Sequence, residues 1–192
     1  MKKVLFGIMA LSAVTFANNN PGTETGASVP VLVKAEIVEP SDSIQITDLS
    51  GRLLSQIELD HGRLVKGAAT ASSVVYQDFK VVKGDGSGGL ADLSPAGKSA
   101  MAVSIDNTTT TLNNKTTPGS TPLESNLSLL GGKDTAVSGN HGYEVDLATG
   151  IKEHVGRIYS ELTPAVLNAG EVGVHDNGSD TILTVLYTPV KP

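Results

Sequence analysis

Short runs in which apolar residues take every second position recur along this chain, with turn residues between them. The clearest run is at residues 29–38, where one face would carry Val29, Val31, Val33, Ala35 and Ile37. Successive side chains of a β-strand point to opposite faces, so this spacing predicts a strand with one apolar face. Pro30 has no N–H to donate, which puts the start of this strand at a strand end or a sheet edge.

Further runs predict strands at residues 43–47, 74–82, 100–105, 123–130, 143–147 and 180–188. Seven or eight short strands separated by Gly, Pro and Asn turns predict an all-β chain folded as an antiparallel β-sandwich. The segment 106–122 is rich in Thr and Asn and contains two prolines, and it is predicted to be a long loop or a weakly paired edge.

Residues 151–162 fit two interpretations. Their apolar residues have helical spacing, but Gly156 lies in the middle of the run, where glycine weakens a helix. A strand and a short helix both remain open for this segment.

Composition excludes several classes of function. The 192 residues include no cysteine, so the chain can have no disulfide, no thiol nucleophile and no cysteine-ligated metal. Its formal net charge is −6, with 14 Lys and Arg against 20 Asp and Glu. That balance opposes nucleic-acid binding, which needs many cations to neutralise phosphates.

The N-terminus has the three parts of a secretory signal. Lys2 and Lys3 precede an apolar run from Val4 to Phe16, and Ala17 ends it as a small residue at a cleavage site. The run is too short to span a bilayer, which takes about 20 residues. We therefore expect a signal peptide at 1–17, a flexible leader at 18–28, a single β-sandwich domain at 29–192, and an exported protein.

The search for catalytic or metal-binding motifs finds no cluster. The histidines lack the spacing of a metal site; they are His61, His141, His154 and His175. The turn Gly84–Gly89 is similar to the loop around the nucleophile of trypsin-like proteases, but an extra glycine interrupts it. The run His175–Asp180 resembles part of a calcium loop, but the strand that follows cuts it short, and a hairpin turn at Asn177-Gly178 explains it without a cation. We predict no enzyme activity, no cofactor and no metal.

Three stretches resemble chaperone–usher fimbrial subunits, nearest to the CS1/alpha-type major pilins and related exported β-sandwich subunits. The first is the strand VPVLVKAEIVEP, which soon follows the signal peptide. The second is ITDLSGRLL, from Ile46. The third consists of Leu167-Asn-Ala-Gly-Glu together with the ending SDTILTVLYTP.

The resemblance implies an immunoglobulin-like sandwich that lacks its last strand. In such subunits a periplasmic chaperone fills the open groove, and at the outer-membrane usher the N-terminal strand of a neighbouring subunit replaces it. The donor residues here would be Val29, Val31, Val33, Ala35 and Ile37. The implied function is a structural subunit of a surface fimbria or pilus, polymerised by donor-strand exchange and contributing to adhesion through a host or cell-surface receptor. The alternative is a monomeric secreted or periplasmic β-sandwich that binds a ligand.

Overall fold

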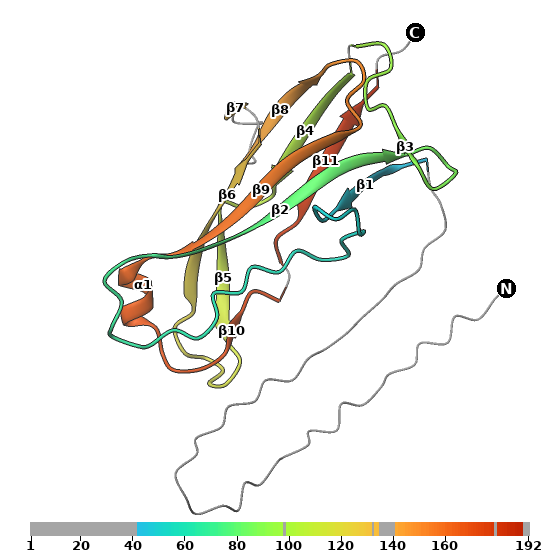
Figure 1. Cartoon of the computed structure of the whole chain (residues 1–192). Coiled ribbons are helices and arrows are strands. Elements are labelled where there is room, and N and C mark those ends of the chain that lie inside the picture. The colour runs from blue at the N-terminus through green and yellow to red at the C-terminus, as the bar shows by residue number, and fades with distance from the viewer. Residues whose placement is uncertain (1–41, 98, 132, 135–140, 179, 190–192) are drawn as a thin grey trace, which may run out of the picture. The chain divides into compact units, whose positions relative to one another are not determined.

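Two antiparallel sheets make up the computed structural model, which describes residues 42–97, 99–131, 133–134, 141–178 and 180–189. The larger sheet has the order β1 (Ile44–Thr47), β2 (Ser73–Gly84), β9 (Glu153–Leu162), β6 (Leu123–Leu130), β5 (Thr109–Asn114) and β10 (His175–Asp176), with β3 (Leu90–Ala91) paired to β2. The smaller sheet has the order β11 (Leu183–Thr188), β4 (Ser99–Ile105), β8 (His141–Leu147) and β7 (Lys133–Asp134). A single turn of helix, α1 (Pro164–Ala169), follows β9 (Figure 1).

Alternating burial shows why these segments are strands. Along β4, every second side chain is buried, from Ser99 to Ile105. In β6 and β9 the same alternation turns one set of residues to the core and the other to solvent. This is the period-two pattern of a sheet with one covered face.

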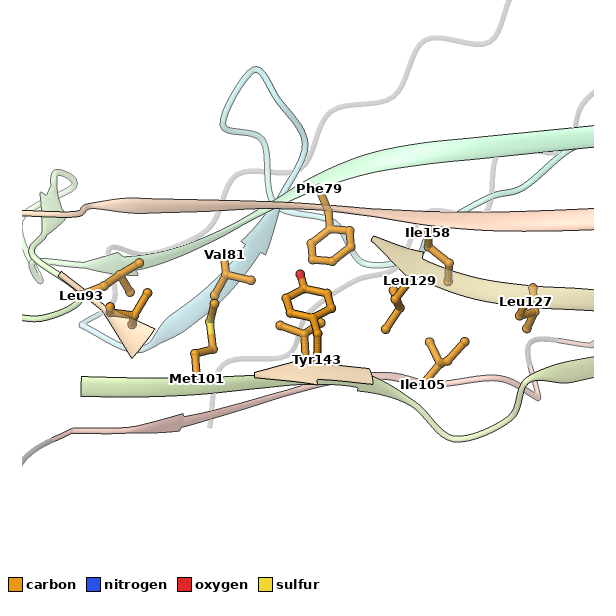
Figure 2. Packing of buried hydrophobic residues seen from close by; sticks show 11 residues of the cluster. Phe79, Val81, Leu93, Met101, Ile105, Leu127, Leu129, Tyr143 and Ile158 are labelled. Atoms are coloured by element: carbon orange, nitrogen blue, oxygen red, sulfur yellow. The ribbon is translucent and has the colours of Figure 1, made fainter. Parts of the chain in front are cut away.

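The core lies between the two sheets. Phe79 and Val81 of β2 approach Met101 of β4 and Tyr143 of β8 from the opposite sheet (Figure 2). Leu129 and Ile158 extend this apolar layer along β6 and β9. The all-β sandwich that the sequence predicts is confirmed.

The strand order is that of an immunoglobulin-like sandwich. In that fold strands A, B, E and D form one sheet, and C, F and G form the other. Here β1, β2, β9 and β6 take the positions of A, B, E and D, while β4 and β11 take those of C and F. Within the described ranges, no strand pairs with the second edge of β11, where strand G belongs.

The structure resolves the segment that the sequence left ambiguous. Residues 153–162 form β9, which pairs with β2 on one side and with β6 on the other. Residues 106–122 contain β5, which lies between β6 and β10, so this segment is not a simple loop. The helix α1 was not predicted at all.

Residues 38–192 form one compact unit. The predicted signal peptide, leader and first strand lie outside the described residues, and their boundaries stay predictions. In the part of the chain that is described, no helix has the length and apolar character needed to cross a membrane.

Candidate functional site: an open groove beside the last strand

A groove with a volume of about 1360 Å³ runs across the inner face of the larger sheet. One wall is the segment 54–66, and the other consists of residues 170–178 and 181–183. The apolar part of the floor comes from three strands, namely Leu112 of β5, Leu123 and Leu127 of β6, and Ile158 and Leu162 of β9. Ile46 of β1 and Leu183 of β11 both line the groove, so it reaches an edge strand of each sheet.

The start of β11, at Leu183, borders this groove, and no described strand pairs with the second edge of β11. The backbone N–H of Asp106 donates to the carbonyl of Ile182 at 3.3 Å, so Ile182 directs its backbone groups toward β4. In an antiparallel ladder alternate residues direct these groups to opposite edges. Leu183, Val185 and Tyr187 therefore direct their N–H and C=O groups away from β4. The side chains of these three residues pack against the core, and among the described residues no strand pairs with their outward backbone groups.

The wall formed by residues 54–66 belongs to the long connection between β1 and β2. Figure 1 shows this connection passing from β1 to the end of the sheet that carries α1. Its first part turns back on β1, because the N–H of Leu54 donates to the carbonyl of Ile46 at 2.9 Å. Leu54, Ile57 and Leu59 then pack as half-buried side chains against the core.

A network of hydrogen-bonded polar side chains runs from this wall to the floor of the groove. The ring of His61 lies 2.9 Å from the hydroxyl of Ser73 through Nδ1 and 2.8 Å from that of Ser160 through Nε2. The Ser160 hydroxyl lies 2.6 Å from the Ser125 hydroxyl, which donates to the carbonyl of Glu161 at 3.3 Å. Burial of the ring lowers the pKa of His61, and the neighbouring Asp60 carboxylate opposes this shift. The network makes one polar patch in an otherwise apolar floor.

The opposite wall is tied to the edge of the larger sheet. β10 pairs with the end of β5, and Asp176 forms an ion pair of 3.0 Å with Lys115. The hydrogen bond from Lys115 within this ion pair lowers the pKa of the Asp176 carboxyl. Asn114 accepts hydrogen bonds from the N–H groups of Thr116 and Thr117, each at 2.9 Å. These contacts fix the residues that face segment 54–66.

The predicted donor residues lie outside the described part of the chain. They are Val29, Val31, Val33, Ala35 and Ile37, so their position relative to the groove stays a prediction. The resemblance implied an open groove, but the residues that form this groove were not predicted, because its floor combines residues that are distant in sequence. The one signal in the sequence was the apolar set Leu54, Ile57 and Leu59, whose spacing fits neither a regular strand nor a regular helix.

The residues considered for catalysis and metal binding have local structural partners. Asp85 accepts hydrogen bonds from the backbone N–H and the hydroxyl of Ser87, at 2.7 and 2.8 Å, within the glycine-rich turn. His154 lies 3.0 Å from the hydroxyl of the buried Tyr143, and its own burial lowers its pKa. Among the described residues, no group of three or more His, Cys, Asp or Glu side chains is placed to hold a metal ion.

The fold and the groove define a class of protein: an immunoglobulin-type sandwich with an apolar-floored groove, whose last described strand has no partner at its second edge among the described residues. No protein-family model matches the chain, and no curated protein matches it. Among solved structures, it is similar to a chain from a chaperone–tip adhesin complex described as vital for synergistic activation of CFA/I fimbriae biogenesis. The TM-score is 0.40 with 16% identity over 77% of this chain, which spans 43% of the length of that one.

Proposed function

We propose that this chain is a structural subunit of a surface fimbria or pilus, polymerised by donor-strand exchange and contributing to adhesion. The observation that carries the proposal is the second edge of β11, which has no partner among the described residues and begins beside a groove with an apolar floor. An exposed strand edge with an apolar face is a template for another strand. Adding an extended segment there supplies backbone hydrogen bonds along the edge and pockets for alternate side chains.

The alternating segment 29–38 suits such a groove. Its apolar side chains fall at every second position, so one face can enter the groove while Leu32, Lys34 and Glu36 face the other way. An extended strand of this length spans about 33 Å at about 3.3 Å a residue. In the proposal, the segment comes from a neighbouring copy or a related subunit.

The remaining partners follow from the same proposal. Before assembly, a periplasmic chaperone would cover the groove, and an outer-membrane usher would host the exchange. The protein would be exported through the inner membrane and would act at the cell surface, without catalysis and without a cofactor. A receptor on a host or another cell would be the target of the adhesion.

The test compares two charge substitutions on opposite faces of the donor segment. Val33→Asp places a carboxylate where an apolar side chain would enter the groove, and burial of an unpaired charge is strongly unfavourable. We expect it to abolish polymers in sheared surface material, while the chain is still exported. Polymers appear in unheated electrophoresis as a ladder that boiling reduces to one band.

Lys34→Asp is the matched control, since it introduces the same carboxylate on the face turned away from the groove. We expect it to leave the ladder intact. Normal ladders from Val33→Asp would contradict the donor role. A single monomer band from the unsubstituted chain would instead favour the monomeric binding protein.

A further inference from the structure

His61 joins one wall of the groove to its floor. The ring projects from segment 54–66 and contacts Ser73 at the start of β2 and Ser160 in β9. His61 and Ser160 both line the groove. The contacts of the His61 ring therefore hold this wall of the groove against the sheet beneath it.

The hydrogen-bond directions fix which ring nitrogen of His61 carries the proton. Ser125 donates its single hydroxyl proton to the carbonyl of Glu161, so Ser160 must donate to Ser125. Ser160 can then only accept from His61, which requires a proton on Nε2. Nδ1 is left to accept from the hydroxyl of Ser73. With a neutral imidazole, every hydrogen bond of this network from Ser73 to Glu161 has a donor and an acceptor.

Few other hydrogen bonds hold this wall. Among the described residues, the other hydrogen bond from segment 55–66 to a strand runs from the N–H of Glu58 to the side-chain oxygen of Gln77, at 3.2 Å. Gly62, with φ +66, bonds within the segment through its N–H to Asp60. Leu64 and Val65 are exposed, so the end of the segment adds little apolar packing. The His61 network is therefore the main polar attachment of this wall.

Protonation of His61 would disturb this arrangement. A second proton on Nδ1 would point at the hydroxyl of Ser73, so this hydroxyl would have to rotate and accept a hydrogen bond instead of donating one. The ring would also become a cation above an apolar floor, which is unfavourable. The strands β2 and β9 present only neutral hydroxyls to the ring. The charged or titratable groups along its own segment are Glu58, Asp60, Arg63 and Lys66, and those of the facing wall are Glu171, His175 and Asp176.

We infer that His61 is a pH-sensitive latch that holds segment 55–66 against the sheet and thereby sets the width of the groove for an incoming strand. The identity of that strand rests on the proposed function. The latch is closed when the ring is neutral and opens when the ring is protonated.

The direction of the pH effect follows from the lowered pKa of His61. The closed state prefers the neutral ring, so its stabilisation is complete above the ordinary histidine pKa of 6.5 and is lost as the pH falls toward the lower pKa of the closed state. At pH values between these two pKa values, the ratio of closed to open states falls by up to about tenfold for each unit by which the pH falls. The nearby Asp60 carboxylate favours the protonated ring and so makes this pH range narrower.

The test measures hydrogen exchange of residues 55–66 in the full chain at pH 7.5 and pH 5.5, corrected for the intrinsic pH dependence of exchange. We expect protection of this segment to fall several-fold, and by at most about tenfold, at the lower pH. Protection of β2 and β9 should change less. Circular dichroism at both pH values verifies that the sandwich remains folded.

Two substitutions separate the latch from a general acid effect. His61→Gln keeps a donor for Ser160 and an acceptor for Ser73 but does not titrate, so its segment should stay protected at both pH values. His175→Gln removes a histidine from the facing wall of the same groove and should behave like the unsubstituted chain. Equal pH dependence in His61→Gln, or no pH dependence in the unsubstituted chain, would overturn the inference.

Binding of a synthetic peptide of residues 29–38 distinguishes this inference from the proposed function. Peptide binding that is the same at both pH values in the unsubstituted chain and in His61→Gln contradicts the latch and leaves strand exchange standing. Failure of the peptide to bind at either pH, together with pH-dependent exchange of the segment, contradicts strand exchange and leaves the latch standing.

Discussion

At the scale of single residues, Gly156 explains both an ambiguity in the sequence and a feature of the core. In the sequence it interrupts helical spacing within 151–162 without indicating what replaces the helix. In the structure it lies in β9, where a Cβ would come within 2.5 Å of the Tyr143 hydroxyl and would also collide with the ring of Phe79. The glycine makes room for two aromatic side chains from β2 and β8, and no pattern in the sequence connects these three residues.

Gly156→Ala is therefore expected to destabilise the fold. Overpacking of a filled core typically costs about 1–3 kcal/mol, and the neighbours here are two buried rings. Denaturation by urea should show this loss as a lower midpoint with an unchanged slope. Ser128→Ala, on the exposed face of the adjacent β6, serves as the control and should leave the midpoint in place. An unchanged midpoint for Gly156→Ala would show that the rings can shift to admit a methyl group.

At the scale of elements, the sequence predicted the strands that have one apolar and one polar face. The strands β2, β4, β6 and β11 follow from alternation of apolar side chains, which records burial on one side of a sheet. By contrast, β5 has mostly Thr and Asn and is held by pairing with its neighbours, so local pattern could not identify it. The helix α1 is six residues long, with Thr163 as its N-cap, and is too short for a periodic signal.

The groove could not be predicted in the same way. Its floor joins side chains of β5, β6 and β9. Its facing walls, segments 54–66 and 170–183, are far apart in the chain. The alternation of apolar residues did indicate a candidate strand for the groove, at residues 29–38. Such a strand can be predicted from neighbouring residues alone, whereas the groove can be predicted only when the order of the strands in the sheets is known.

The two edges of β11 differ, and this difference can be tested with proline. Thr184 directs its N–H toward β4, so Thr184→Pro removes a ladder hydrogen bond and should destabilise the fold by about 1–3 kcal/mol. Val185 directs its N–H to the free edge, so Val185→Pro should cost less in a urea titration of the monomer. In surface material, however, Val185→Pro should weaken the ladder, because an incoming strand loses a donor. Equal destabilisation by the two prolines would contradict the assignment of the free edge.

At the scale of the whole molecule, the proposed strand exchange depends on one position of an immunoglobulin-type strand order that no described strand fills. Six strands take the positions of A to F, and the described residues supply no strand at the position of G. The groove reaches an edge strand of each sheet, β1 through Ile46 and β11 through Leu183. A chain with this arrangement can bury its apolar floor by accepting a strand from another copy, and such an exchange joins copies end to end.

Disulfide trapping tests whether residues 29–38 of one copy occupy the groove of another, as we propose. The chain has no cysteine, so every cross-link comes from the introduced pair. Leu183→Cys is combined in turn with Val31→Cys, Val33→Cys or Ala35→Cys, since a disulfide needs Cα atoms about 4.4–6.8 Å apart. Leu32→Cys and Lys34→Cys, on the opposite face, are the controls. We expect at least one of the three pairs to give a ladder that survives boiling and collapses on reduction, with no ladder from the controls. A cross-link confined to the monomer, or none at any position, would contradict it.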